Sequence, residues 1–345
     1  MNKIMMSGLR FLCYCLLFFL WFSCGSKETS ELKDDDNQIK EPENTDKFTV
    51  KALMNTFWTN TSYLEFDKLR LETMDLMQTY ADLCSNTEFK EYYAADEDKA
   101  SQMEEGSILL FHREALEKVL EELPEEKVVE GKIVLWQVYN MGYIVKTPSH
   151  CFGIDVKHKD AAKFAPYLDF LLITHAHEDH YTTDLIEAMM EKGKPVYSNF
   201  VNNEYKISEK KTINLIDDIF MEVNITDHNA TLPNFVVTYQ IDCGSDTDNC
   251  VVFHVGDSYD HTQLNPTKDV DIFIPHLAVG LDMPAAVSKI KPEIVLMSHI
   301  LEMDHPVTQW RWSYQYGVAR CQELAHDKVY LPVWGEKISY EKTKE

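Results

Sequence analysis

The sequence predicts an α/β fold, in which buried strands alternate with amphipathic helices. Apolar runs such as 171–174 and 250–256 are each followed by polar residues. This pattern is typical of a buried strand that ends at the edge of a sheet. Helical patterns lie between such runs; one covers 183–192, ends at Gly193 and is followed by Pro195. This alternation is typical of layered α/β domains, although it does not fix the order of the strands.

The length and composition set the size of the core. A chain of 345 residues with 45% hydrophobic content can bury one large core or two smaller ones. We therefore expect a globular enzyme with an appended segment, and nothing in the sequence suggests a repeat array.

The first 23 residues resemble a bacterial lipoprotein signal. Lys3 and Arg10 accompany an apolar run over 11–22 that is too short to span a bilayer comfortably, and Cys24 follows almost at once. Cleavage would leave Cys24 as a lipid-bearing N-terminus. We expect an anchor in the bacterial cell envelope, at the outer membrane and facing the periplasm or the cell surface. An ordinary signal peptide or a single membrane anchor is the alternative.

Three further segments follow the signal. Residues 24–47 are charged and polar and predict a disordered tether. Residues 48–128 predict a helical extension or cap, packed on a catalytic domain at 129–345. Two apolar stripes mark its expected buried faces: Leu69, Thr73, Leu76, Tyr80 and Leu83, then Leu109, Leu116, Leu120 and Leu123 before Pro124.

Four potential metal ligands follow the strand at 171–174 within six residues: His175, His177, Asp179 and His180. Because side chains alternate along an extended backbone, His175 and His177 point to the same side and can share one ion. Asp179 and His180 follow where the chain turns toward the next helix, so they could hold a second ion. Zinc takes about four ligands, and a working site leaves one position to water. The loop therefore needs ligands from elsewhere.

Three polar residues at the ends of other apolar strands could converge on this loop: His228, Asp257 and His299. Two neighbours in the sequence stay open as alternative ligands. His254 lies within an apolar strand, so we expect it in the core or behind a ligand. His305 lies in a loop before a proline, where it could line the entrance.

Through these residues the sequence resembles the metallo-β-lactamase superfamily. The His-x-His-x-Asp-His motif of that superfamily is intact over 175–180. The resemblance covers roughly residues 131–335. It implies a four-layer αβ/βα sandwich, in which two mixed sheets are covered outside by helices. The segment 281–299 is also similar to the last helix and strand of the ascorbate-6-phosphate lactonase-like branch.

The resemblance implies a site for two divalent metal ions. Three side chains would bind each ion: His175, His177 and His228 for the first, and Asp179, His180 and His299 for the second. Asp257 would bridge the ions, and Asp155, at the end of an early strand, would brace the metal loop. Asp179 and Asp257 are the residues expected to act in catalysis.

The ligand types favour zinc, although iron or manganese could occupy the same site. Two ions that share a water would lower its pKa from near 16 to roughly 7 or below, so hydroxide would be available at neutral pH. Diiron relatives that reduce oxygen carry a glutamate where this chain has His177, so redox chemistry is the weaker prediction.

The expected activity is hydrolysis of an ester, lactone or phosphodiester bond in a small or amphipathic substrate. One alternative is hydrolysis of a β-lactam, although true β-lactamases lack the bridging aspartate. The other is a metal-binding module without catalytic activity. The net charge of −24 and the scattered Lys and Arg residues argue against nucleic acid as a partner. These features do not predict an oligomeric state.

The cysteines give little metal signal, because none forms a Cys-x-x-Cys pair. Cys243 and Cys250 flank a short loop between two strands and could form a disulfide in an oxidising compartment. We expect Cys84, Cys151 and Cys321 to be small buried hydrophobic residues.

Overall fold

The computed structural model describes residues 49–342. The signal expected over 1–23, the lipid attachment at Cys24 and the tether up to residue 47 lie outside these residues. Between residues 49 and 342, no helix has both the length and the apolar character needed to cross a bilayer.

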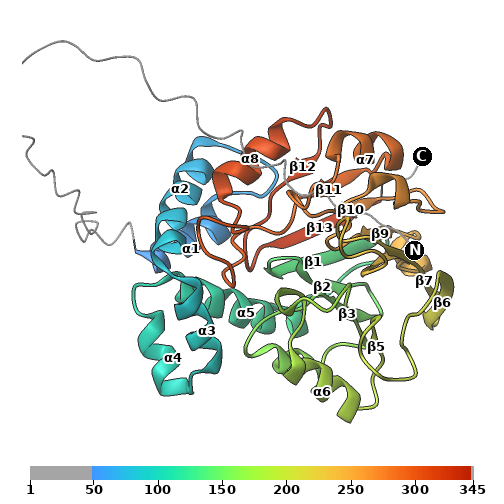
Figure 1. Cartoon of the computed structure of the whole chain (residues 1–345), viewed down its shortest axis with the longest axis horizontal. Coiled ribbons are helices and arrows are strands. Elements are labelled where there is room, and N and C mark those ends of the chain that lie inside the picture. The colour runs from blue at the N-terminus through green and yellow to red at the C-terminus, as the bar shows by residue number, and fades with distance from the viewer. Residues whose placement is uncertain (1–48, 343–345) are drawn as a thin grey trace, which may run out of the picture. The chain divides into compact units, whose positions relative to one another are not determined.

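Two mixed β-sheets occupy the centre of the described chain (Figure 1). The first has the order β13-β1-β2-β3-β4-β5, with strands at Lys337–Glu341, Lys132–Tyr139, Gly142–Lys146, Cys151–Ile154, Phe170–Leu172 and Val196–Tyr197. The second has the order β12-β11-β10-β9-β8-β7-β6, with strands at Val329–Tyr330, Ile294–Leu296, Ile272–Ile274, Val251–His254, Val236–Asp242, Ile219–Thr226 and Lys211–Ile216. In each sheet, antiparallel strands at one end give way to parallel strands at the other.

The alternation of side chains along the strands explains the layers. In β1, Ile133 and Leu135 belong to a buried cluster that also contains Met221 of the second sheet, so this face lies between the two sheets. Val134 and Trp136 point the other way, into a second cluster shared with the helices. The four-layer αβ/βα arrangement expected from the sequence, with its N-terminal helical extension, is therefore confirmed.

The helical extension precedes the first strand. It contains α1 (Val50–Asn55), a π-helical turn (Thr56–Asn60), α2 (Lys68–Leu83), α3 (Asn86–Ala94), α4 (Glu97–Glu104) and α5 (Ile108–Glu125). A capping side chain accepts a backbone N–H at the start of each helix from α2 to α5: Asp67, Ser85, Asp96 and Ser107. Three later helices complete the cover: α6 (Thr183–Glu191), α7 (Met283–Ile290) and α8 (Tyr314–Gln322).

The extension packs on the rest of the chain through one continuous hydrophobic cluster. The indole of Trp58 also donates a hydrogen bond to the Trp334 carbonyl at 2.9 Å, and the Trp136 indole donates to Glu122 at 2.8 Å. The stripe predicted for α5 is confirmed, because Leu109, Leu116 and Leu123 are buried and Leu120 packs against the cluster. The proposed domain boundary at residue 128 stays a prediction.

The stripe predicted for α2 is confirmed in its middle, where Thr73 is buried and Leu76 and Tyr80 pack against the hydrophobic cluster, and is wrong at its two ends. Leu69 and Leu83 are 45% and 63% exposed, and the buried face is instead centred on Met74, Met77 and Ala81. Arg70 is also buried on this face. Its guanidinium donates two hydrogen bonds to the carboxylate of Glu336, at 2.6 and 2.8 Å, and one to the Leu331 carbonyl at 2.9 Å. The buried ion pair thus makes Arg70 part of the inward face of the helix, whereas Leu69 and Leu83 lie outside this face.

The described cysteines are all free and buried. Burial of Cys84, Cys151 and Cys321 is as expected. Cys243 and Cys250 lie on neighbouring strand ends, where the Cys243 backbone N–H donates to the Cys250 carbonyl at 2.9 Å, and they form no disulfide in this structure.

Replacement of Arg70 tests how strongly α2 depends on this pair. Arg70→Met should lower the free energy of unfolding by about 3–5 kcal/mol, because it leaves the Glu336 carboxylate buried without a counter-charge. Urea denaturation measures the change. The control is Lys68→Met on the exposed face of the same helix, where the ion pair with Glu72 is worth under about 1 kcal/mol. Equal effects of the two substitutions would contradict this role for Arg70.

Candidate metal centre

The candidate site begins where β4 ends and the chain crosses to the other sheet. The carbonyl of Ile173 accepts a hydrogen bond from the Tyr239 hydroxyl, and that of Thr174 accepts one from the Val237 backbone N–H, both at 2.7 Å. Since Val237 and Tyr239 lie on β8, these bonds join the metal loop to the second sheet. The loop then makes a short 3₁₀ turn at Glu178–His180.

A glycine lets the next segment approach this loop. Gly256 has a φ of +49°, and a Cβ atom at this position would lie 2.7 Å from the Cβ and Oγ1 atoms of Thr174. The close contact places the following residue, Asp257, beside the loop.

Asp155 fixes the loop from below. Its carboxylate is fully buried and accepts hydrogen bonds from the Thr174 backbone N–H and from the Thr174 hydroxyl, both at 2.7 Å. It also accepts the Nδ1–H of His180 at 2.8 Å. These hydrogen bonds suit the bracing role that the sequence resemblance implied for Asp155, and the role itself stays a prediction.

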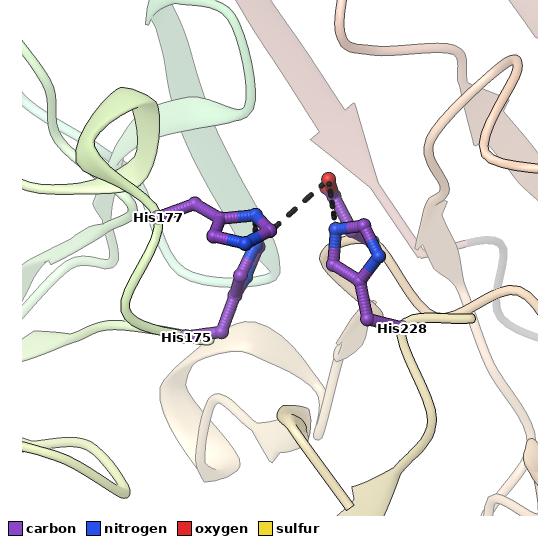
Figure 2. Close-up of side chains that lie close together, drawn as sticks. His175, His177 and His228 are labelled. Carbon is purple, nitrogen blue, oxygen red and sulfur yellow. Dashed lines mark hydrogen bonds and ion pairs between the residues drawn. The ribbon is translucent and has the colours of Figure 1, made fainter. Parts of the chain in front are cut away.

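The residues predicted for the first ion lie together. His175, His177 and His228, with Asp257, present nitrogen and oxygen atoms that all lie within 4.8 Å of one another. His175 Nε2 is 3.1 Å from His177 Nδ1, and His228 Nε2 is 3.3 Å from Asp257 Oδ2. Figure 2 shows the rings of His175 and His177, from one loop, turned toward that of His228, from a segment about 50 residues further along the chain.

The residues predicted for the second ion form a neighbouring group of Asp179, His180 and His299. His299 Nε2 lies 3.1 Å and His180 Nε2 lies 3.4 Å from Asp179 Oδ2. Asp257 reaches this group as well, because its Oδ1 atom is 3.2 Å from His180 Nε2. The structure therefore brings together all seven predicted ligands, with Asp257 in contact with both groups. Their assignment to particular ions stays a prediction.

The tautomers of two histidines suit metal binding. The Thr174 hydroxyl donates to Asp155, so its oxygen accepts the Nδ1–H of His175 at 3.0 Å. His180 donates its own Nδ1–H to Asp155. In the neutral form of each ring, Nε2 therefore carries a lone pair that faces the cluster.

Several atoms at the centre lack hydrogen-bond partners among the described residues. Among them are His180 Nε2, His228 Nε2 and Asp257 Oδ1, and each is buried. When the His180 ring is neutral, a lone pair on its Nε2 faces an oxygen lone pair of Asp257 at 3.2 Å, and a cation would satisfy both. Nitrogen and carboxylate ligands without thiolates are suited to a divalent ion. The residues present therefore fit the metal that the sequence implies.

The pKa shifts in the metal-free chain also indicate that this cluster suits a positive charge. Burial lowers the pKa of His180, but the charges of Asp179, Asp257 and Asp155 outweigh burial and hold this pKa well above its usual value. In the metal-free chain, a proton on His180 therefore supplies a positive charge beside the three carboxylates. Burial raises the pKa of Asp257, but the neighbouring histidines, with His180 foremost, hold it well below the usual value. The Asp257 carboxylate is therefore ionised at neutral pH, as a ligand must be.

The two alternative histidines take other roles. His254 accepts the Gly256 N–H at Nδ1 and lies 3.0 Å from the Met141 carbonyl at Nε2, so both of its nitrogens are engaged within the protein. His305 is half-buried and contacts Glu302, and it belongs to none of the ligand groups.

Sequence reasoning missed two residues at the centre. Asn140 donates a hydrogen bond to Asp179 Oδ2 at 2.9 Å, and no motif marked it. His276 lies 3.9 Å from Asp257 Oδ2 and stacks on His299. A signal for His276 was present, because it follows the apolar strand β10 as Asp257 follows β9.

No protein-family model and no curated protein matches this sequence. Similar solved structures include a metallo hydrolase from the hyperthermophilic archaeon Ignicoccus hospitalis, with 16% identity, coverage of 61% of this chain and 100% of that chain, and a TM-score of 0.48. Another is the metallo-β-lactamase fold protein YhfI from Bacillus subtilis (11% identity, 61% and 99% coverage, TM-score 0.42). A third is an isothiocyanate hydrolase from Delia radicum gut bacteria (14% identity, 61% and 100% coverage, TM-score 0.42). At these identities and TM-scores, the similarity is limited to the fold and does not extend to activity.

Asp155→Asn tests the brace under the metal loop. The amide can no longer accept every hydrogen bond that the carboxylate accepts, so the His180 ring loses its fixed orientation. We expect the affinity for Zn²⁺ to fall by about 10- to 100-fold, as measured by competition with a chromophoric chelator. The matched control is Asp271→Asn, another buried aspartate that accepts hydrogen bonds, from the Val251 N–H and the Tyr340 hydroxyl. The same loss of affinity in both variants would contradict the role of Asp155.

A pair of carboxyl groups lies further along the loop that follows His299. Asp304 Oδ2 is buried without a hydrogen-bond partner among residues 49–342, and Glu302 is fully buried nearby. Burial, and then the negative charge of Glu302, raise the pKa of Asp304 to about 6. Lys157 Nζ, at 4.0 Å, offsets only part of this effect.

Asp304 should make the stability of the metal-free protein depend on pH. Because its pKa is higher in the folded chain than in the unfolded chain, the folded state binds more protons between about pH 4 and 6, and stability falls as the pH rises through this window. Asp304→Asn should therefore raise the free energy of unfolding at pH 7.5 by roughly 1–3 kcal/mol and change it little at pH 4. Urea denaturation at both pH values measures this, with the surface variant Asp327→Asn as control. An equal effect at both pH values would contradict the assignment.

Proposed function

We propose that this protein is a hydrolase that uses two divalent metal ions to cleave an ester, lactone or phosphodiester bond in a small or amphipathic substrate. The observation that carries the proposal is the position of Asp257. Its two carboxylate oxygens reach one predicted ligand of each ion, His228 at 3.3 Å and His180 at 3.2 Å. A carboxylate shared in this way suits a pair of adjacent ions.

The bound ions would supply hydroxide at neutral pH and polarise the carbonyl or phosphoryl oxygen of the substrate. The side chains would prepare the site for this chemistry. Asp257, which is ionised, would hold the two halves of the site at a fixed separation. The ring of Phe235 lies 5.5 Å from that of His175 and 4.9 Å from that of His177, and places an apolar surface beside the first group.

Asp179 is the candidate for proton transfer. Burial raises its pKa, but the positive charge of His180 and contact with His299 hold the pKa well below the usual value, so the group is a carboxylate at neutral pH. Asn140 holds one of its oxygens at 2.9 Å. In this position Asp179 can accept a proton at its carboxylate and pass it to the oxygen or nitrogen of the leaving group.

The identity of the metal and the cellular location are further parts of the proposal. Zinc suits histidine and carboxylate ligands, and iron or manganese is the alternative. The N-terminal sequence supports a lipid on Cys24 and a location in the cell envelope, where an amphipathic substrate would be accessible.

The net charge of −24 disfavours a polyanionic substrate. Similarity of 281–299 to the lactonase-like branch makes a lactone the first substrate to try.

Removal of the metal and of the shared carboxylate tests the proposal. Protein purified without its lipid should hydrolyse one class in a panel of phosphodiester, lactone, ester and β-lactam substrates. A chelator should abolish that activity, and added divalent ions should restore it. Asp257→Ala and Asp179→Ala should each lower kcat/KM by about 10³-fold or more, since each removes a group that acts on the reacting centre.

The outcomes separate the alternatives. Activity confined to β-lactams would select antibiotic hydrolysis, and bound metal without turnover would select a binding module. Hydrolysis that survives both chelation and Asp257→Ala would contradict the proposed mechanism.

A further inference from the structure

A histidine outside both predicted ligand sets lies at the metal centre. His276 follows β10 and is buried, with 4% of its surface exposed. Its ring stacks on that of His299, with centroids 3.9 Å apart and planes inclined by 22°. The Nε2 atoms of both rings lie 3.9 Å from the same oxygen of Asp257. His276 therefore faces the space into which the predicted ligands of the second ion point.

The hydrogen bond on the other side of the ring determines what His276 can do there. The backbone N–H of Ala278 donates to His276 Nδ1 at 2.8 Å. Because Nδ1 must accept this hydrogen bond, its lone pair is engaged, and the hydrogen of the neutral ring sits on Nε2. His175 and His180 have the opposite tautomer, since each donates from Nδ1. Nε2 is thus a donor in His276 and an acceptor in those two ligands.

A donor at this position is available to a bound molecule. The distance of 3.9 Å to Asp257 Oδ2 is too long for a hydrogen bond, so the carboxylate does not hold the Nε2–H. A neutral imidazole could release this hydrogen as a proton only by becoming an imidazolate, which is strongly disfavoured. His276 therefore suits donation of a hydrogen bond and does not suit proton transfer.

We propose that His276 donates a hydrogen bond from Nε2 to an anionic oxygen of the bound substrate or product, and that it is not a metal ligand. The proposal rests on the proposed hydrolase function, in which negative charge develops on a carbonyl or phosphoryl oxygen beside the metal ions. A fixed donor at that oxygen stabilises the charge. It favours substrates and products whose oxygen atoms carry charge, such as carboxylates and phosphate monoanions.

Two variants of His276 distinguish the effect of its hydrogen-bond donor from the effect of its ring. His276→Gln can place an amide N–H near the position of Nε2, whereas His276→Phe keeps a ring against His299 but has no donor. The measurements are the metal content of the purified protein and the affinity of the metal-loaded protein for inorganic phosphate, by titration calorimetry. His276→Asn is a third variant, which keeps an acceptor for the Ala278 N–H but is too short to reach the position of Nε2.

We expect all variants to retain the metal content of the wild-type protein. His276→Phe and His276→Asn should bind phosphate about 10- to 100-fold more weakly than the wild type, because a hydrogen bond to a charged oxygen is lost. His276→Gln should lie closer to the wild type. If His276→Phe fails to fold, as judged by near-ultraviolet circular dichroism, the comparison between Asn and Gln decides the question.

Three results would overturn the proposal. Loss of metal from the Phe and Asn variants would show that His276 is a ligand. Equal phosphate affinity in the donor and non-donor variants, or no phosphate binding by the wild-type protein, would show that it does not serve an anionic oxygen. None of these measurements requires turnover. A protein that binds metal and phosphate but hydrolyses nothing would contradict the proposed function and still support the role of His276.

Discussion

The buried carboxylate of Asp155 is the interaction on which the site depends. It accepts both the backbone N–H and the hydroxyl of Thr174, and it also accepts the Nδ1–H of His180. These three bonds set the course of the loop after β4 and the tautomer of one ligand. Through the Thr174 hydroxyl, the same carboxylate sets the tautomer of His175. One fully buried charge thus couples the end of the first sheet to the chemistry of the centre.

The residues of the candidate metal centre could be predicted largely from the sequence, because their positions follow a simple rule. Buried strands end at a common edge of the sheets, and polar residues that follow them meet there. This rule and the intact motif over 175–180 placed His228, Asp257 and His299 near the loop, and the structure places them there. The same rule applied to β10 would have added His276. The outer layers followed from the alternation of strands and helices.

The features that could not be predicted depend on partners far away in the sequence. The inward face of α2 includes the buried Arg70, whose partner Glu336 lies 266 residues further along the chain, and the apolar pattern of the helix gives no sign of this pair. Asn140 contacts Asp179 because a turn between β1 and β2 reaches the metal loop.

The last strand has a consequence for how the protein folds. β13 forms one edge of the first sheet by pairing with β1, so Lys132 lies opposite Glu341 and Trp136 lies opposite Lys337. About 200 residues separate these partners, and until β13 docks the backbone of β1 has an unpaired edge. Such an edge can recruit strands from other chains. A folding intermediate without β13 in place is therefore exposed to aggregation, and a chaperone that shields this edge would protect it.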